Sequence, residues 1–230
     1  MYSQLFAITN RKLCPNIDTN SDFYPGSSYY NTYLAQIDYI ASLNIKGIIL
    51  RENDLSEDIY TMLSADVIKI CEAHNTELIL HNFVNSATQL NYRKIHLPLH
   101  ILNDLHTKSV SIQHTDSLIQ HNASQAPNMS LSGFDIIGTS VHSLQELETA
   151  LKCGANYVFA GNIYETDCKQ GLAGRGLSFL ENICHQSPVP VYAIGGITLS
   201  KMPEVLSVGA SGGCMMSGFM RMNKIQPYNL

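Results

Sequence analysis

Several polar side chains in this sequence directly follow short apolar runs, where the ends of buried strands would present them. His142 closes the stretch GTSVH that begins at Gly138, and an imidazole can take up and return a proton near neutral pH. Ser140, in the same turn, could hydrogen-bond a ligand beside it. His81 follows the run ELIL and is a weaker candidate for the same role. The sequence contains nine histidines, so a structural role is the alternative for His142.

Two cations are candidates for holding an anionic substrate. Lys169 lies in the glycine-containing loop 165–176, ETDCKQGLAGRG, which could close over a carboxylate or phosphate. Arg51 directly follows the apolar run GIIL and could make a bidentate contact with an anion. The alternatives are a solvated surface lysine in the first case and an ion pair of Arg51 with Glu52 or Asp54 in the second.

Two short glycine-containing stretches are typical of a phosphate site. They are AIGGI at 193–197 and MMSG at 215–218. Glycine lets backbone amides approach phosphate oxygens without a Cβ in the way, and a serine adds a hydroxyl donor. A tight turn alone would also explain a glycine pair, but two such loops in succession favour phosphate binding. The expected phosphate-binding residues are Gly195, Gly196, Ile197, Ser217 and Gly218.

The elements that would position these residues alternate between strands and helices along the chain. Strands are expected at 5–9, 47–50, 77–80, 95–97, 136–139, 157–160, 189–194 and 213–216, and helices at 29–43, after Ser56, and at 143–153, 177–184 and 199–208. The polar segment 103–133 is expected to be loop, with at most a short helix over Ser117–His121. This pattern predicts one (β/α)8 TIM barrel, with the site at the carboxyl ends of its strands. A doubly wound open sheet is the structural alternative, because periodicity does not show closure.

Length and composition limit the class of protein. A single domain over residues 1–230 fits the usual size of such a barrel. The net charge of −5, without a cluster of Lys and Arg, argues against a nucleic-acid partner. Six cysteines without CxxC spacing suggest neither a zinc site nor a disulfide framework. No apolar run suits a signal peptide or a membrane span, so we expect no membrane partner and a cytoplasmic location.

The sequence resembles the thiamine phosphate synthase and TenI superfamily. The resemblance runs from AIT at 7–9 and LRE at 50–52 to GTSVHS, GANYVFAGNIYETDCK, AIGGI and MMSG, and it is strongest after Phe134. It implies a (β/α)8 barrel and a small phosphorylated thiazole as the ligand. It also implies ligand contacts at Gly195, Gly196 and Ser217, and in the loop from Thr166 to Cys168.

The residues depart from the synthase branch of this superfamily at several positions. That branch has a Gln two residues before the Arg and a Lys two residues after it, where this chain has Ile49 and Asn53. Its Asn-Asp pair for magnesium is replaced by His81 and Asn82, and HLPLHI at 96–101 lacks its further acid. Without these contacts, joining a pyrimidine diphosphate to the thiazole is less expected.

The motif ETDCK followed by GRG is more similar to TenI-type thiazole tautomerases. That resemblance implies an isomerase of thiamine biosynthesis, which aromatises a carboxythiazole phosphate with His142 as the acid-base residue. Lys169 and Arg51 would hold anionic groups, and no cofactor would be needed. Thiamine phosphate synthase, with magnesium, is the first alternative, and a non-catalytic binder of thiazole or thiamine phosphate is the second. The oligomeric state, including a homo-oligomer, stays open.

Overall fold

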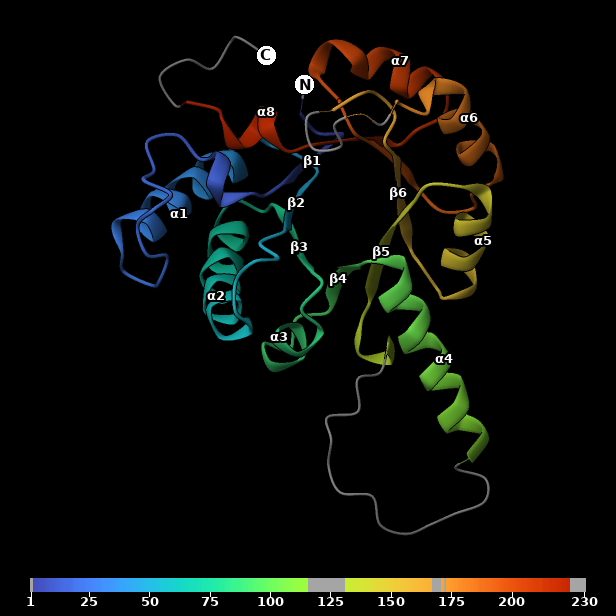
Figure 1. Cartoon of the computed structure of the whole chain (residues 1–230), viewed down its shortest axis with the longest axis horizontal. Coiled ribbons are helices and arrows are strands. Elements are labelled where there is room, and N and C mark those ends of the chain that lie inside the picture. Colours follow the sequence, from blue (N-terminus) through green and yellow to red (C-terminus); the bar gives the residue numbers. More distant parts are fainter. Residues whose placement is uncertain (1, 116–130, 167–170, 172, 224–230) are drawn as a thin grey trace.

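The chain forms a closed barrel of eight parallel strands in sequence order, as a computed structural model shows for residues 2–115, 131–166, 171 and 173–223 (Figure 1). The first and last strands pair, with Phe6 beside Cys214, so the predicted TIM barrel is confirmed and the open sheet is excluded. The strands are β1 Leu5–Ile8, β2 Gly47–Leu50, β3 Glu77–His81, β4 Lys94–Leu97, β5 Ile136–Val141, β6 Tyr157–Gly161, β7 Val191–Ile194 and β8 Gly212–Met215.

Helices follow the strands and surround the barrel (Figure 1). They are α1 Ser28–Ala41, α2 Glu57–Ala73, α3 Val84–Gln89, α4 Leu99–Thr115, α5 Leu144–Lys152, α6 Gly176–Gln186, α7 Met202–Ser207 and α8 Ser217–Met220. Short 3-10 turns lie at Arg11–Leu13, Leu131–Gly133 and Leu199–Lys201. Serines begin several helices: the side chains of Ser27, Ser56 and Ser143 accept hydrogen bonds from the amides three residues further on.

Two apolar cores lie on the two sides of the barrel wall. Side chains alternate across a strand, so that Ile48 packs among the helices while Ile49 faces the barrel interior. The interior is rich in aromatic rings, and Phe6 lies 4.9 Å from Tyr192 between ring centroids. The interior cluster contains Phe6, Ile8, Ile49, Ile79, Tyr157, Phe159, Tyr192 and Cys214. The barrel is therefore a packed core, and a ligand can be held only at its rim.

Two helices were not expected from the sequence. The prediction that 103–133 is mainly loop is wrong for its first part, because α4 runs to Thr115. The far end of this helix extends beyond the ring of helices (Figure 1). Only Leu102 and Leu105 are buried among its residues up to Val110, so the helix has a weak apolar period. The short helix α3 was missed because its 6 residues are too few to show a helical period. The expected helix at Ser117–His121 lies outside the described residues.

Helix α1 is hydrogen-bonded to the segment around α8, far away in the sequence. The Nε2 of Gln36 on α1 donates to the carbonyl oxygens of Phe219, at 3.1 Å, and Met222, at 3.0 Å. Phe219 lies in α8 and Met222 two residues after it, so the side chain of Gln36 contacts the last turn of this helix and the segment that follows. The residues after β8 are therefore held in place by the first helix of the barrel.

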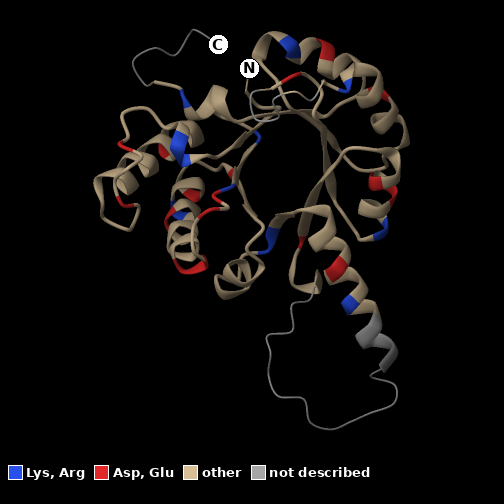
Figure 2. Cartoon of the chain, viewed as in Figure 1, with Lys and Arg blue, Asp and Glu red and all other residues tan. Residues whose placement is uncertain are grey.

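Charged residues of both signs are spread over the helices and loops, and few lie on the strands (Figure 2). This distribution agrees with the absence of a Lys and Arg cluster in the sequence. Among the residues described here, no helix is both long and apolar enough to cross a membrane.

Candidate active site

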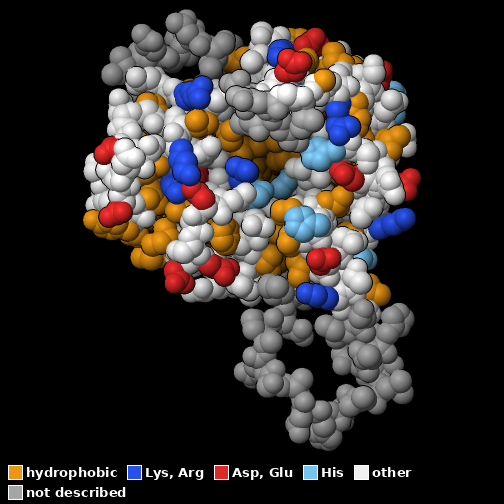
Figure 3. All heavy atoms as spheres, in the orientation of Figure 1, with side chains coloured by type: hydrophobic (Ala, Val, Ile, Leu, Met, Phe, Trp, Pro, Cys, Tyr) orange, Lys and Arg blue, Asp and Glu red, His pale blue; other side chains and the backbone are white. Residues whose placement is uncertain are grey.

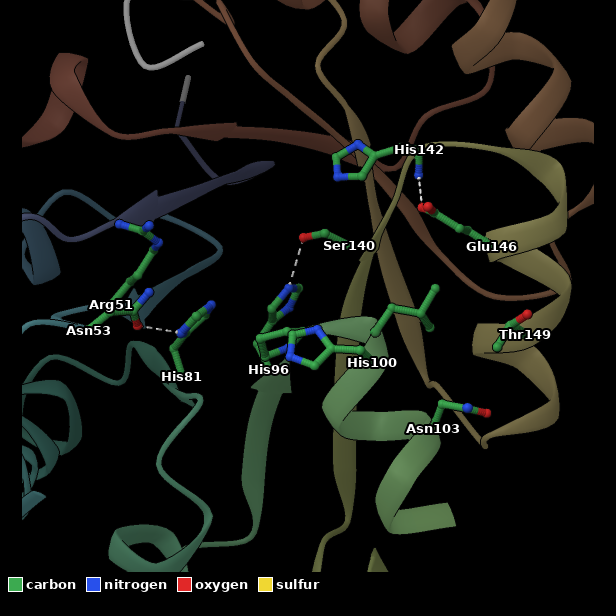
Figure 4. A pocket seen from close by; sticks show the side chains of 12 residues that line it. Arg51, Asn53, His81, His96, His100, Asn103, Ser140, His142, Glu146 and Thr149 are labelled. Carbon is green, nitrogen blue, oxygen red and sulfur yellow. Dashed lines mark hydrogen bonds between the residues drawn. The ribbon is translucent and has the colours of Figure 1, made fainter. Parts of the chain in front are cut away.

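A cavity of about 640 Å³ opens at the carboxyl ends of strands β2 to β5. In the space-filling view the molecule is hollowed near its centre, and histidine and basic side chains surround the hollow (Figure 3). Arg51 and His81 lie across the cavity from His142 (Figure 4). Its lining residues are Arg51, Asn53, His81, His96, Pro98, Leu99, His100, Asn103, Ser140, His142, Glu146 and Thr149. The structure thus brings four of the residues proposed for chemistry to one cavity: Arg51, His81, Ser140 and His142.

The backbone of His142 is fixed by the start of α5. Ser143 caps this helix and accepts a hydrogen bond from the amide of Glu146, while the Glu146 carboxylate accepts one from the amide of His142, at 2.6 Å. The sequence Ser-x-x-Glu is the signature of a capping box, in which the glutamate normally accepts a hydrogen bond from the amide of the serine; here it accepts one from the residue before the serine. The main use of Glu146 in this structure is therefore to hold the residue that carries the imidazole (Figure 4).

The imidazole ring of His142 is oriented by a second contact. Its Nδ1 is hydrogen-bonded to the backbone carbonyl oxygen of Gly161, the last residue of β6. A carbonyl oxygen only accepts, so Nδ1 carries the hydrogen, and Nε2 of the neutral ring has a free lone pair. Within the described residues Nε2 has no hydrogen-bond partner. This is the tautomer that a proton acceptor facing the cavity requires.

Arg51 lines the cavity but makes neither of the ion pairs considered from the sequence. The carboxylates of Glu52 and Asp54 bind Arg11 instead. In the segment directly after β2, Glu52 is buried whereas Arg51 is exposed and lines the cavity. Arg51 has no ion pair within the described part of the chain, and its guanidinium is available to an anion.

His81, the weaker candidate, also lies in the cavity, at the end of β3. Its Nδ1 is 3.0 Å from the Oδ1 of Asn53. Burial, and secondly the charge of Arg51, lower the pKa of His81 to about 4. At neutral pH this imidazole is uncharged, so the positive charge on this side of the cavity comes from Arg51.

His96 and His100 also line the cavity and were not predicted as site residues. His96 is 3% exposed, and its Nε2 lies 3.1 Å from the Oγ of Ser140. Burial, and secondly His81, lower its pKa far below the usual value, so the ring is neutral. Its position inside the apolar run IHL was the available signal, since a polar residue in a buried strand needs a partner.

The proposed phosphate-binding residues lie at the ends of β7 and β8, outside the set that lines the cavity. Gly195 and Gly196 adopt φ values of +96° and +64°, and a Cβ on either would meet the loop after β6 at 2.5 Å. The turn therefore requires glycine whether or not phosphate binds. Ser217 is exposed at the start of α8, and no hydrogen bond to its hydroxyl occurs within the described residues. Ile197 is buried, so only its backbone could contact a ligand.

The loop after β6 is described only in part. Thr166 belongs to the described residues, whereas Cys168 and Lys169 lie outside them. The predicted roles of Cys168 and Lys169 therefore stay predictions.

Comparisons with known proteins give the chain its family. A family model described as thiamine monophosphate synthase (TMP-TENI) matches residues 24–219. The chain is 30% identical over 199 residues to a thiamine-phosphate synthase of Clostridium acetobutylicum, which covers 84% of this chain and 92% of that protein. With a thiamine-phosphate synthase of Caldivirga maquilingensis it shares 36% identity over 85 residues, so it matches only 42% of that protein's length and 37% of its own.

A solved structure shares the fold. The thiamine phosphate pyrophosphorylase from Pyrococcus furiosus superposes with a TM-score of 0.68, over 96% of this chain and 89% of that one, at 21% identity. At this identity the likeness concerns the fold alone. Since the family model covers most of the sequence and the barrel agrees with it, the chain belongs to the thiamine monophosphate synthase and TenI family.

Proposed function

We propose that this protein is a thiazole tautomerase, an isomerase of thiamine biosynthesis that aromatises a carboxythiazole phosphate. One observation carries the proposal: the Nδ1 of His142 is hydrogen-bonded to the carbonyl of Gly161, which leaves Nε2 as a proton acceptor at the cavity. General acid-base transfer by an oriented imidazole contributes about 10²- to 10⁴-fold to a rate. The reaction moves protons within one molecule, so it needs no second substrate.

The chemistry follows from the position of this nitrogen. Nε2 would take the proton from the ring carbon that bears the carboxylate, and the resulting imidazolium would return a proton to the exocyclic carbon. The ring double bonds shift and the substrate and product have the same composition. In the imidazolium both ring nitrogens donate, so the bond to Gly161 persists throughout the cycle.

The other side chains would bind and orient the substrate. Arg51, exposed on the opposite side of the cavity, suits a carboxylate, and Ser140 adds a hydrogen bond. Lys169, Thr166 and Cys168 would contribute from the loop after β6. The phosphate would be held by backbone amides and a hydroxyl in the two loops proposed for it, at Gly195, Gly196, Ile197, Ser217 and Gly218.

Thiamine phosphate synthase is the second candidate, and the names of the relatives favour it. Its magnesium would need hard oxygen ligands, chiefly carboxylates. Among the described residues that line the cavity, Glu146 is the one carboxylate, and it already accepts a hydrogen bond from the backbone amide of His142. The cavity residues contributed by β3 and β4 are His81 and His96, and Pro98, Leu99 and His100 follow β4. This donor set does not fit magnesium.

One assay separates these candidates. The purified protein is given the carboxythiazole phosphate alone, and then with hydroxymethylpyrimidine diphosphate and magnesium. Conversion to the aromatic tautomer without metal supports the tautomerase. Thiamine phosphate and pyrophosphate formed only in the second mixture would overturn it in favour of the synthase. Binding of the phosphate with an unchanged tautomer ratio would indicate the third reading, a non-catalytic binding protein.

A further inference from the structure

Three polar side chains, hydrogen-bonded in series, connect the barrel interior to the cavity. The hydroxyl of Tyr157 lies 3.0 Å from the Nδ1 of His96, and the Nε2 of His96 lies 3.1 Å from the Oγ of Ser140. Tyr157 is 6% exposed and packs among the aromatic rings of the interior, while Ser140 reaches the cavity (Figure 4). The proposed proton transfer at His142 uses neither Tyr157 nor His96.

The register of the barrel builds this arrangement. His96 on β4 is level with Gly138 on β5, and Gly138 is level with Tyr157 on β6. A Cβ on Gly138 would lie 2.0 Å from the tyrosine ring, so only glycine lets the tyrosine cross over β5 toward His96. The pair is thus specified by three residues on three strands.

The protonation states of Tyr157 and His96 limit how hydrogen atoms can be placed in this series of hydrogen bonds. Burial raises the pKa of Tyr157 well above its usual value, so the phenol keeps its proton. Burial lowers the pKa of His96, so its ring is neutral, with one donor and one acceptor nitrogen. Within the described residues, His96 is the hydrogen-bond partner of the Tyr157 hydroxyl.

Only one of the two directions satisfies every group. If Tyr157 donates to Nδ1, then Nε2–H donates to Ser140 and the serine hydrogen points to the cavity. In the opposite direction, Ser140 donates to Nε2, Nδ1–H donates to the phenol, and the phenolic hydrogen is left among aromatic rings. A buried donor without an acceptor is disfavoured, so the first direction prevails.

We propose that Tyr157 and His96 are positioning residues that hold Ser140 as a hydrogen-bond donor to the ligand. The ligand atom beside Ser140 must then be an acceptor, such as a carboxylate oxygen, and an N–H group at this place would be rejected. This inference rests on the proposed function, because it assumes that a small acid occupies the cavity.

The tautomer of His96 can be measured without any ligand. Nitrogen-15 NMR of histidine-labelled protein distinguishes a protonated ring nitrogen from an unprotonated one, and a His96→Gln variant identifies the signals. We expect His96 to be protonated at Nε2 only and not to titrate between pH 5 and 8. Protonation at Nδ1 would overturn the proposal.

A second measurement uses two tyrosines of the same interior. Tyr157→Phe removes the donor to His96. Tyr192→Phe is the matched control, because Tyr192 lies in the same aromatic cluster and its hydroxyl has no hydrogen bond within the described residues. With the carboxythiazole phosphate, we expect Tyr157→Phe to raise KM by about 3- to 10-fold, the range of one net hydrogen bond, with kcat little changed. Equal effects of the two variants would contradict the proposal.

The two measurements keep this proposal separate from the proposed function. No turnover by the unaltered protein would count against the tautomerase alone. The hydrogen placement would still be decided by the spectrum of the unaltered protein, and by the loss of the Nε2 tautomer in Tyr157→Phe. Circular dichroism of both variants checks that the barrel is intact.

Discussion

The Nδ1 of His142 is hydrogen-bonded to the carbonyl oxygen of Gly161, so the last residue of β6 orients the imidazole that follows β5. This contact assigns the hydrogen to one ring nitrogen and the free lone pair to the other. A residue with no side chain therefore decides which atom of His142 can take a proton.

The first prediction concerns this imidazole. His142→Ala removes the proton acceptor, and we expect kcat for tautomerisation to fall by about 10²- to 10⁴-fold with little change in phosphate binding. The variant keeps the backbone amide of residue 142, which donates a hydrogen bond to Glu146, so the start of α5 should be unchanged. Steady-state kinetics and calorimetric binding measure the two effects. His185→Ala, an exposed histidine on α6, is the matched control, and full activity of His142→Ala would remove His142 as the base.

A second prediction concerns the phosphate loop after β8. Ser217→Ala should weaken binding of the thiazole phosphate by about 0.5–1.5 kcal/mol, the net value of one hydrogen bond, or somewhat more for a charged acceptor. Titration calorimetry of both proteins gives the difference. Ser211→Ala, on the other side of β8, should bind as the unaltered protein does. An unchanged affinity in Ser217→Ala would exclude this hydroxyl from the phosphate site.

The third prediction concerns the buried carboxylate next to Arg51. Glu52 is 2% exposed and accepts hydrogen bonds from the amide of Arg11, at 3.0 Å, and from its guanidinium, at 3.2 Å. Arg11→Ala leaves this carboxylate without its cation, and we expect a loss of about 3–5 kcal/mol in the free energy of unfolding. Lys12→Ala, which removes an exposed ion pair with Asp54, should cost less than about 1 kcal/mol. Urea denaturation that finds equal losses would show that Arg11 does not compensate Glu52.

The fourth prediction concerns the pH dependence of stability. Burial lowers the pKa of His81 to about 4 and the pKa of His96 well below its usual value. Below the ordinary histidine pKa of about 6.5 the unfolded chain binds protons that the folded chain does not, so stability should fall as pH drops from 7 toward 4. Each histidine contributes a slope of up to about 1.4 kcal/mol per pH unit.

Urea unfolding between pH 5 and 8 tests this slope. His96→Gln should be less stable than the unaltered protein at pH 8, yet lose less stability on acidification, because its folded and unfolded forms bind protons more equally. A slope in His96→Gln as steep as that of the unaltered protein would show that His96 titrates normally in the fold.

The sequence was sufficient to predict eight alternating strand–helix units, because eight short apolar runs separated by amphipathic segments are typical of a parallel sheet covered by helices. It was not sufficient for α4. Up to Val110, Leu102 and Leu105 are the buried residues of that helix, and so sparse an apolar period is difficult to distinguish from that of a loop. Closure was also beyond the sequence, since it depends on the pairing of β1 with β8.

The site was predictable where a polar residue ends an apolar run, as at Ser140 and His142. The buried residues behind the cavity could not be predicted. His96 lies between Ile95 and Leu97, where a histidine is usually a packed core residue, and its neighbours on β5 and β6 follow only from the register. The partner of Glu52 was also missed, because Arg11 is 41 residues away in the sequence.

The fastening of Gln36 to residues 219 and 222 has a consequence for folding. These contacts join groups 183 and 186 positions apart, and the pairing of β1 with β8 spans a similar separation. Such non-local contacts form late, since a long loop must first be closed. During synthesis the edge of β1 that faces β8 has no partner until residues 212–215 have emerged, and we expect this edge to be prone to pair with other chains. We therefore expect aggregation mainly in the period before β8 pairs with β1 and closes the barrel.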